Sequence, residues 1–343
     1  MTDVVEYTAD YKAAWSTFVE KADNATIAHD IGWMEVIAKG LGHTPRYLLA
    51  VDGQQVTGIL PLFEVKTWWR SRYLVSLPWI DYGGVCAADA ATEQLLVARG
   101  REITEQARAE FMELRSVNPT AVDLPTSQKK VTFLLQLDRD PEKVWTGFNA
   151  KLRNQIRKAD KSGLTTELGG LEFLGAFYKV FARNMRDLGT PVWGRDFFAE
   201  ILTTFKDSAR IILVRMSGRV IAGGLVLSFK DRLYVPSASA YREYLKYCPN
   251  HALYWRVIKD GCEGGYRFFD FGRSTWESNT FKFKKQWAPE PTQLSWQYHL
   301  NKTQEIPMVN PSNPRYRLFI GLWRKLPLAI ANAVGPKLIK NFP

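Results

Sequence analysis

The sequence has few cysteines and histidines and none of the common nucleotide-binding or hydrolase motifs. Its three cysteines form an odd set without a CxxC spacing, and its four histidines have no metal-ligand spacing. These absences argue against a disulfide framework and a zinc site. The motifs GxGxxG, GxxxxGK[ST], HExxH and GxSxG do not occur, so dinucleotide, P-loop, zincin and hydrolase sites have no support. We expect reduced thiols, no metal and no tightly bound cofactor.

The sequence also shows no signal for secretion or for a membrane span. Its start, Met1–Glu6, has no basic region that leads into an apolar one, so no secretory signal is visible. The C-terminal stretch 316–342 is basic and apolar but too interrupted to span a bilayer. With Trp323 it suits the surface of an anionic inner leaflet, whereas Pro327 and Pro336 equally allow packing on the protein. We expect a cytoplasmic protein, with peripheral contact at the inner membrane face left open.

Composition and charge narrow the function class. The chain has 343 residues, of which 46% are hydrophobic and 13% aromatic, which is typical of an ordered protein with room for two domains. Its net charge is +11, and such a charge attracts polyanions. Candidates are tRNA, the phosphates of coenzyme A, lipid-linked glycan pyrophosphates and an acidic membrane. Charge alone does not choose between them, and solvated lysines are the simpler alternative.

An internal repeat appears when the chain is shifted by 165 residues. Segment 47–62 then lies over 212–227, and both read as two strands joined by a tight turn. Four small or apolar positions coincide: Gly53 with Gly218, Gly58 with Gly223, Leu60 with Leu225, and Leu62 with Leu227. Upstream, the helical stretch 33–38 lies over 198–203. Each half therefore begins with a helix and a hairpin.

Both halves continue in the same predicted order of strand, helix and strand. In the second half these elements are 232–240, 252–263 and 266–271, and in the first half they are 72–77, 92–115 and 131–136. The order indicates a mixed α/β (α+β) fold, which many functions share. We place the first domain at residues 1–143, the second at 144–303 and a basic amphipathic tail at 304–343.

Two segments of the second half carry a specific resemblance. The strand end Asp270–Ser274 reads DFGRS, and Phe281–Ala288 reads FKFKKQWA; together they resemble the signature near the end of the second domain in FemA/FemB-like proteins. The basic segment Lys151–Ala159 is similar to the helix that opens that domain. The basic apolar tail 315–340 is similar to that of the branch associated with exopolysaccharide and PEP-CTERM protein-sorting systems. The resemblance covers most of the chain, although Ala288 replaces the family's last glycine.

This resemblance implies two tandem domains of the GNAT (acyl-CoA N-acyltransferase) type and an acyltransferase activity. It implies transfer of an aminoacyl or acyl group to an amine on a cell-envelope, peptidoglycan or exopolysaccharide precursor, which can be lipid-linked. The donor would be aminoacyl-tRNA or acyl-CoA, used as a cosubstrate. The second half has no long heptad insertion, so the donor stays open. Alternatives are an acetyl-CoA-dependent N-acetyltransferase of an amino sugar and a non-catalytic scaffold that binds tRNA or a lipid-linked glycan.

Three residues are candidates for catalysis. Acyl transfer needs a deprotonated nucleophile and donors for the oxyanion. The resemblance implies that Lys284 stabilises the negative charge of the oxyanion or binds a phosphate of the donor. The alternative is that Lys282, Lys284 and Lys285 form one solvated basic cluster. If the segment is extended, Lys282 and Lys284 share one face, which favours a pair of cations facing a groove and makes Lys282 a candidate for substrate binding. Asp270 ends a predicted strand and either accepts a proton or braces the loop through Arg273.

Five residues around the predicted helix 252–263 are candidates for substrate binding. Asn250 and His251 lie where the helix begins, so free backbone amides there would suit a phosphate or carboxylate. Asn250 is also a good helix cap. No glycine-rich loop precedes the helix, which puts ordinary coenzyme A binding in doubt. Tyr241, Arg242 and Tyr244 come just before and could contact an acceptor sugar or peptide.

A basic stripe is the last candidate site. Along the predicted helix 150–162, Arg153, Arg157 and Lys161 repeat every four residues, so their side chains share one face. A polyanion would bind such a stripe, and a solvated helix face is the alternative.

Overall fold

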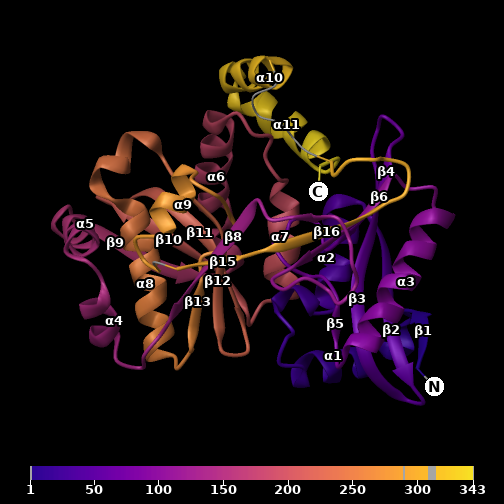
Figure 1. The fold of residues 1–343 in the computed structure, drawn as a ribbon. Coiled ribbons are helices and arrows are strands. Elements are labelled where there is room, and N and C mark those ends of the chain that lie inside the picture. The colour runs from indigo at the N-terminus through magenta and orange to yellow at the C-terminus, as the bar shows by residue number, and fades with distance from the viewer. Residues whose placement is uncertain (1, 289, 308–313, 343) are drawn as a thin grey trace. The chain divides into compact units, whose positions relative to one another are not determined.

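The structure, a computed structural model, describes residues 2–288, 290–307 and 314–342, with only the backbone of 314–317. The chain forms two compact units, each containing one mixed sheet. Unit 1 comprises Met1–Val131, Gln293–Val309 and Lys340–Pro343, and unit 2 comprises Thr132–Thr292 and Asn310–Ile339. The predicted mixed α/β class is confirmed (Figure 1).

The sheet of unit 1 has the strand order β1-β2-β3-β4-β6-β16-β7, with β5 paired to β3. Its strands are β1 (Asp3–Glu6), β2 (Thr44–Asp52), β3 (Gln55–Lys66), β4 (Arg72–Ser76), β5 (Cys86–Ala87), β6 (Phe111–Ser116), β7 (Thr126–Ser127) and β16 (Ser295–Leu300). Its helices are η1 (Ala9–Tyr11), α1 (Lys12–Lys21), η2 (Ile27–His29), α2 (Gly32–Leu41) and α3 (Ala90–Gln106).

Two apolar clusters form the core of unit 1. In the first, Leu96 and Ile103 of α3 pack with Leu60 and Leu62 of β3, so α3 covers one part of the sheet. The second contains Val65, Tyr73, Tyr82 and Phe111 together with Leu294, Trp296 and Tyr298. Burial of these side chains is the main stabilising term of the unit.

The sheet of unit 2 has the order β14-β8-β13-β12-β11-β10-β9, with β15 paired to β8. Its strands are β8 (Lys130–Gln136), β9 (Leu164–Gly169), β10 (Ala209–Met216), β11 (Arg219–Phe229), β12 (Arg232–Ala240), β13 (Phe268–Asp270), β14 (Ser274–Thr275) and β15 (Pro291–Gln293). Its helices are α4 (Pro141–Gly147), α5 (Ala150–Lys161), η3 (Leu171–Phe173), α6 (Leu174–Leu188), α7 (Arg195–Thr204), η4 (Arg242–Tyr247), α8 (Pro249–Glu263), α9 (Asn279–Lys284), α10 (Pro314–Lys325) and α11 (Leu328–Ile339).

Helices α6 and α8 cover opposite faces of the second sheet. Successive residues of a strand point to opposite faces, and two neighbouring glycines of β11 show what lies on each side. A Cβ on Gly223 would meet Phe177 of α6, whereas a Cβ on Gly224 would meet Leu253 of α8. The sheet is therefore the middle layer of unit 2.

The internal repeat is confirmed by two equivalent hairpins. In unit 1, α2 precedes the hairpin β2–β3, and in unit 2, α7 precedes β10–β11. Each hairpin has a register irregularity at a nearly equivalent place, between Ala50 and Val51 and between Val214 and Arg215. The repeat therefore reflects two copies of one supersecondary unit.

Two strands are exchanged between the halves of the sequence. β8, which we predicted to close the first half, pairs antiparallel with β13 of unit 2, and β16 from the end of the second half pairs antiparallel with β6 of unit 1. The units therefore divide at 131/132 and 292/293, not at the expected domain limits 143/144 and 303/304. The reason is that each sheet contains one parallel pair of strands, and the next strand after that pair comes from the other half of the sequence. This strand is β16 beside β4–β6 in unit 1 and β8 beside β12–β13 in unit 2.

The predicted helix 92–115 is wrong in its last third. Helix α3 ends at Gln106, Arg108 adopts a left-handed conformation with φ 52°, and the N–H of Ala109 bonds the carbonyl of Thr104. Residues Phe111–Ser116 then form β6, which is parallel to β4. The cause is tertiary, because β6 is buried in the middle of the sheet and yet contains the charged pair Glu113 and Arg115. Its sequence therefore lacks the apolar run that indicates a buried strand.

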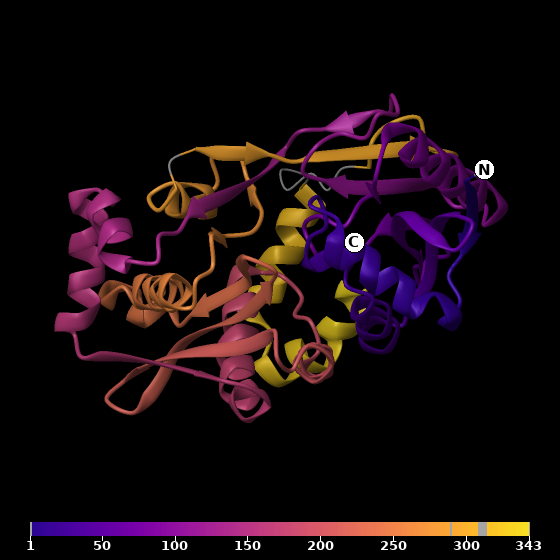
Figure 2. The same ribbon diagram turned by 90° about the horizontal axis from the view of Figure 1, so that it is seen from below.

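The basic tail is helical and partly packed on unit 2. Helices α10 and α11 both contact α6 (Figure 2), and Trp323 is buried, so this tryptophan fits the alternative in which the tail packs on the protein. The side chains of Arg315 and Arg317 lie outside the described part. No helix in the described ranges is long and apolar enough to cross a bilayer.

Candidate functional site

Strands β12 and β13 of unit 2 pair over three residues and then separate. Arg232–Tyr234 pairs in parallel with Phe268–Asp270, after which β13 ends while β12 continues from Val235 to Ala240. There it pairs only with β11 in the described structure. On the side away from β11, the backbone of Val235–Ala240 therefore has no strand partner in the described structure. We call this feature the β12–β13 opening.

Asp270 lies at the closed end of this opening. It is the last residue of β13 and is buried. Its Oδ1 accepts hydrogen bonds of 2.8 Å from the hydroxyl of Thr132 on β8 and from the backbone N–H of Gly272. The carboxylate therefore fixes the turn that follows the strand. This arrangement favours the bracing interpretation of Asp270.

Lys284 is buried and holds the same turn from the other side. Its Nζ donates to the carbonyls of Gly272 and Arg273, both at 2.9 Å. The prediction that Lys282 and Lys284 share a face of an extended segment is wrong, because Ser278 caps a helix, α9, over these residues. Lys282 is exposed. Lys284 is thus separate from any solvated lysine cluster, and Arg273, half-buried, belongs to the turn that Lys284 holds.

The start of α8 differs from the cap that we predicted. Cys248, with φ 60°, is the N-cap residue, and Asn250 is the second residue of the helix. The N–H groups of His251 and Ala252 already bond the carbonyl of Cys248, and Pro249 has no N–H. This helix end therefore offers few free amides to a pyrophosphate.

His251 lies in an aromatic cluster that sequence reasoning did not identify. Its ring contacts Phe283 at 5.1 Å and stacks on Trp287 at 5.9 Å between ring centroids, and Tyr254 and Phe271 pack around them. Burial lowers the pKa of His251 to about 4, so the imidazole is neutral at pH 7. His251 Nε2 and Trp287 Nε1 have no hydrogen-bond partner within the described structure. Only the density of aromatic residues after Phe281 could have indicated this cluster.

The candidate acceptor-binding residues lie between β12 and α8, with Arg242 and Tyr244 on η4 and Tyr241 at its N-cap. Arg183 of α6 stacks over Tyr241 at 4.8 Å and pairs with Glu243 at 3.0 Å, and Arg219 lies over Tyr244 at 5.6 Å. Arg242 is exposed. The two tyrosines are therefore tied to arginines of neighbouring elements, while Arg242 faces solvent.

The predicted basic stripe lies on α5. Leu152 and Ile156 face inward, and Asn149 caps the helix. Arg157 stacks over Trp145 at 5.3 Å, and Arg153 donates to the carbonyl of Thr146 at 3.3 Å. The helix contacts α8, so its cations lie in the same unit as the opening. The structure does not bring Arg153 or Arg157 into contact with Asp270 or Lys284.

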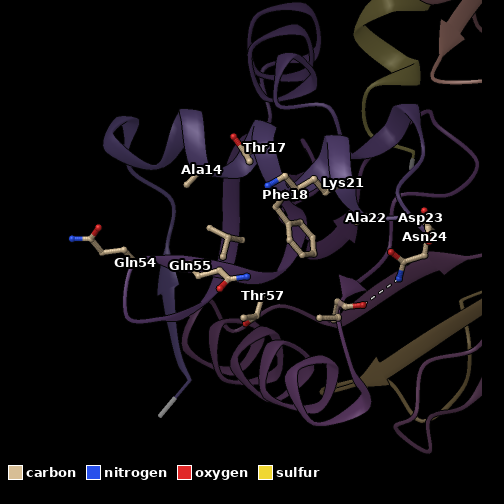
Figure 3. Close-up of a pocket in the computed structure, with 13 residues that line it drawn as sticks. Ala14, Thr17, Phe18, Lys21, Ala22, Asp23, Asn24, Gln54, Gln55 and Thr57 are labelled. Carbon is tan, nitrogen blue, oxygen red and sulfur yellow. Dashed lines mark hydrogen bonds between the residues drawn. The ribbon is translucent and has the colours of Figure 1, made fainter.

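Two cavities lie away from the β12–β13 opening. One of about 930 Å³ in unit 1 is lined by α1, the β2–β3 turn and Ala87, with Asn24 bonded to the carbonyl of Ala87 (Figure 3). Another of about 340 Å³ in unit 2 is lined by Arg210, Arg256 and Asp260. Neither contains a predicted site residue. No group of three metal-ligating side chains occurs in the residues that the structure describes.

Residues 147–285 match the family described as "Acetyltransferase (GNAT) domain". No curated protein matches the chain by sequence.

Among solved structures, FemX is similar with a TM-score of 0.63 and 14% identity, covering 93% of this chain and 100% of FemX. The C-terminal domain of a putative lysylphosphatidylglycerol synthetase from Agrobacterium fabrum has a TM-score of 0.57 and 14% identity, covering 84% and 92%. A tandem GNAT protein from the clavulanic acid biosynthesis pathway has a TM-score of 0.52 and 13% identity, covering 87% and 98%.

The matched segment 147–285 contains β12, β13, α8 and Lys284, and the structural similarities extend over both units. The match to a GNAT domain supports an acyltransferase activity, whose partners are an acyl donor and an acceptor. Residues 147–285 thus match a GNAT domain, and the whole chain has a FemAB-like fold of two tandem GNAT-like domains.

Proposed function

We propose that this protein transfers an acyl or aminoacyl group to an amine, with the reacting groups held at the β12–β13 opening of unit 2. The observation that carries the proposal is the parting of β12 and β13 after Tyr234 and Asp270, inside the segment that matches a GNAT domain. The open edge of β12 would bind the donor as an extended chain. Its backbone N–H groups are also donors for a developing oxyanion.

In this proposal Asp270 and Lys284 position the turn that closes the opening. The ammonium group of Lys284 donates hydrogen bonds to the carbonyls of Gly272 and Arg273. The carboxylate of Asp270 accepts from the N–H of Gly272 and the hydroxyl of Thr132. They fix Gly272 and Arg273 from both sides. Arg273, half-buried in that turn, would then be the cation that faces the donor or the oxyanion. The catalytic role that the resemblance gave to Lys284 becomes one of positioning.

The start of α8 favours a donor other than ordinary acetyl-CoA. A pyrophosphate needs several free amides at a helix N-terminus, and here Cys248 accepts two of them. An aminoacyl group carried by tRNA would place its polyanion on a wider basic surface, and Lys151, Arg157 and Lys158 of α5 are exposed. Arg153 and Arg157 would contact that polyanion.

The proposed acceptor is an amine on a cell-envelope or exopolysaccharide precursor. The sequence resemblance supports it, and so does a structural neighbour whose name joins a lysyl group to phosphatidylglycerol. Tyr241, Arg242 and Tyr244 lie between β12 and α8 and would contact the acceptor. The match to an acetyltransferase domain favours a second candidate, an acetyl-CoA-dependent N-acetyltransferase of an amino sugar.

Ligand-dependent thermal unfolding distinguishes the two donors, because a ligand of the native state raises its stability by mass action. Purified protein is heated with acetyl-CoA, with aminoacyl-tRNA and with uncharged tRNA at the same low salt. We expect a larger rise in Tm with aminoacyl-tRNA than with uncharged tRNA. A rise with acetyl-CoA alone would establish the second candidate, and no rise with any of them would contradict both.

A pair of lysine variants tests the site. We expect Lys284→Met to lower kcat/KM roughly 100-fold, because the loss of two buried hydrogen bonds displaces the Gly272–Arg273 turn, and to lower stability by about 1–3 kcal/mol. The matched variant Lys282→Met, on the exposed side of α9, should change neither. Equal activity of Lys284→Met and the wild type would show that the Gly272–Arg273 turn is not part of the active site.

A further inference from the structure

A tight turn at the tip of the β3–β4 hairpin in unit 1 exposes two adjacent tryptophans. Thr67 and Ser71 close the turn, with the N–H and the hydroxyl of Thr67 both donating to the carbonyl of Ser71. Trp68 is 64% exposed and Trp69 is 49% exposed. Large apolar side chains rarely stay in water together without a binding role.

The C-terminal end of the chain holds this turn in place. Asn341 is buried, its Oδ1 accepts from the N–H of Trp68 at 3.0 Å, and its carbonyl accepts from the hydroxyl of Tyr73 at 2.8 Å. Phe342, 36% exposed, contacts Trp69 at 5.7 Å between ring centroids. Trp68, Trp69 and Phe342 therefore form one fixed aromatic patch, which we call the tryptophan patch.

The surroundings of the tryptophan patch are basic. Arg70, within the turn, and Lys340, next to Asn341, are exposed and form no ion pair in the described part of the chain. Lys66 and Arg72 flank the turn and share the buried carboxylate of Glu64. Glu110 lies beside the turn and accepts from the hydroxyl of Ser71 at 2.6 Å. No acidic residue occurs in the turn itself, from Lys66 to Arg72, or after Glu305. The patch thus combines exposed aromatic rings with an excess of positive charge.

We propose that the tryptophan patch docks this protein on an anionic phospholipid bilayer. Indole rings are amphipathic and favour the level of the lipid headgroups. Lysines and arginines beside them are attracted to anionic lipids. The rings stand on the projecting tip of a hairpin, and this tip inserts between the lipid headgroups. The two unpaired cations, Arg70 and Lys340, are attracted to the negative charge of the bilayer surface. This docking is independent of the acyl donor and of the β12–β13 opening.

Vesicle binding measures the proposal directly. The full-length protein is sedimented with phosphatidylcholine vesicles and with vesicles that also contain phosphatidylglycerol, at increasing salt. We expect binding to the anionic vesicles, weakened by salt as the Debye length shortens. Arg70→Gln with Lys340→Gln should weaken partitioning about fivefold for each cation removed. Trp68→Ala with Trp69→Ala should weaken it roughly tenfold or more through the lost apolar burial.

Matched controls separate this patch from general charge and exposure. Lys179→Gln with Lys206→Gln changes the net charge equally at exposed positions of unit 2, and Trp276→Ala removes another exposed indole. Both should bind vesicles like the wild type, and all variants should keep the wild-type thermal unfolding curve because the altered side chains are exposed.

Three outcomes would overturn the proposal. Absence of wild-type binding to the anionic vesicles would reject a lipid surface as the partner of the patch. Normal binding by both patch variants rejects it as well. The proposal is also rejected if only the double variant Leu318→Ser with Leu322→Ser loses vesicle binding. Those exposed leucines belong to α10 and not to the tryptophan patch.

Discussion

At the scale of single residues, the environment changes what a side chain can do. Lys284 reads in the sequence as one of three neighbouring lysines, yet its ammonium group is buried and bonded to two carbonyls. A buried lysine is uncommon unless its donors are satisfied. His251 is likewise kept neutral by burial among aromatic rings. The chemistry of both residues therefore follows from their neighbours.

Two histidines with a lowered pKa, His43 and His251, should make stability fall on mild acidification. Burial lowers the pKa of His43 and of His251 to about 4, below the ordinary value near 6.5 that the unfolded chain keeps. As pH falls from 6.5 to about 4 the unfolded state takes up protons that the native state does not, so the free energy of unfolding falls by up to about 1.4 kcal/mol per pH unit for each histidine.

We expect His43→Gln and His251→Gln each to flatten this dependence, measured by urea unfolding across that pH range. The double variant should flatten it most. A slope that stays unchanged in both single variants would show that other groups cause it.

At the scale of elements, the repeated glycines have a packing role. A Cβ on Gly58 would lie 2.8 Å from Thr92 Cγ2 and 2.9 Å from Leu96 Cδ1 of α3, and one on Gly223 would lie 3.3 Å from Phe177 of α6. In both units this glycine lets a helix approach the second strand of the hairpin. The coincidence of the two glycines in the sequence repeat thus has a physical cause.

Alanine at these positions should overpack the interface. We expect Gly58→Ala to lower the free energy of unfolding by about 1–3 kcal/mol, and Gly223→Ala to lower it less, since its nearest contacts are 3.0–3.3 Å. Gly147→Ala is the control, because its Cβ would meet nothing within 4 Å at the end of α4. The comparison uses urea midpoints, and equal stability of Gly58→Ala and the wild type would show that α3 can shift.

At the scale of the whole molecule, the exchanged strands make each unit depend on distant sequence. Strand β16 supplies Trp296 and Tyr298 to the second core cluster of unit 1, and Leu294 precedes it. Strand β6 ends at Ser116, whereas β16 begins only at Ser295, so these side chains come from a distant part of the sequence. Cutting the sequence at a single position therefore does not yield a complete folding unit in this protein.

A fragment of residues 1–143 should fail to fold cooperatively. It retains β8 without its partner β13 and leaves β6 without β16, so an unpaired strand and an open edge remain. We expect no sigmoidal urea transition by circular dichroism. A second chain that joins 1–131 through a flexible linker to 293–309 restores β16 and should regain a transition. Cooperative unfolding of the first fragment would contradict the dependence on β16.

The sequence by itself determined the elements whose signals are local. The equivalent hairpins, the helices before them and the mixed α/β class follow from short periodic patterns, and the DFGRS and FKFKKQWA segments indicated the FemAB-like fold. Only the tertiary structure decided the rest. Strand exchange, the end of α3, the hydrogen bonds of Lys284 to two carbonyls and the meeting of Asn341 with the Trp68 turn all depend on burial and on contacts between residues far apart in the chain, and no local pattern encodes those.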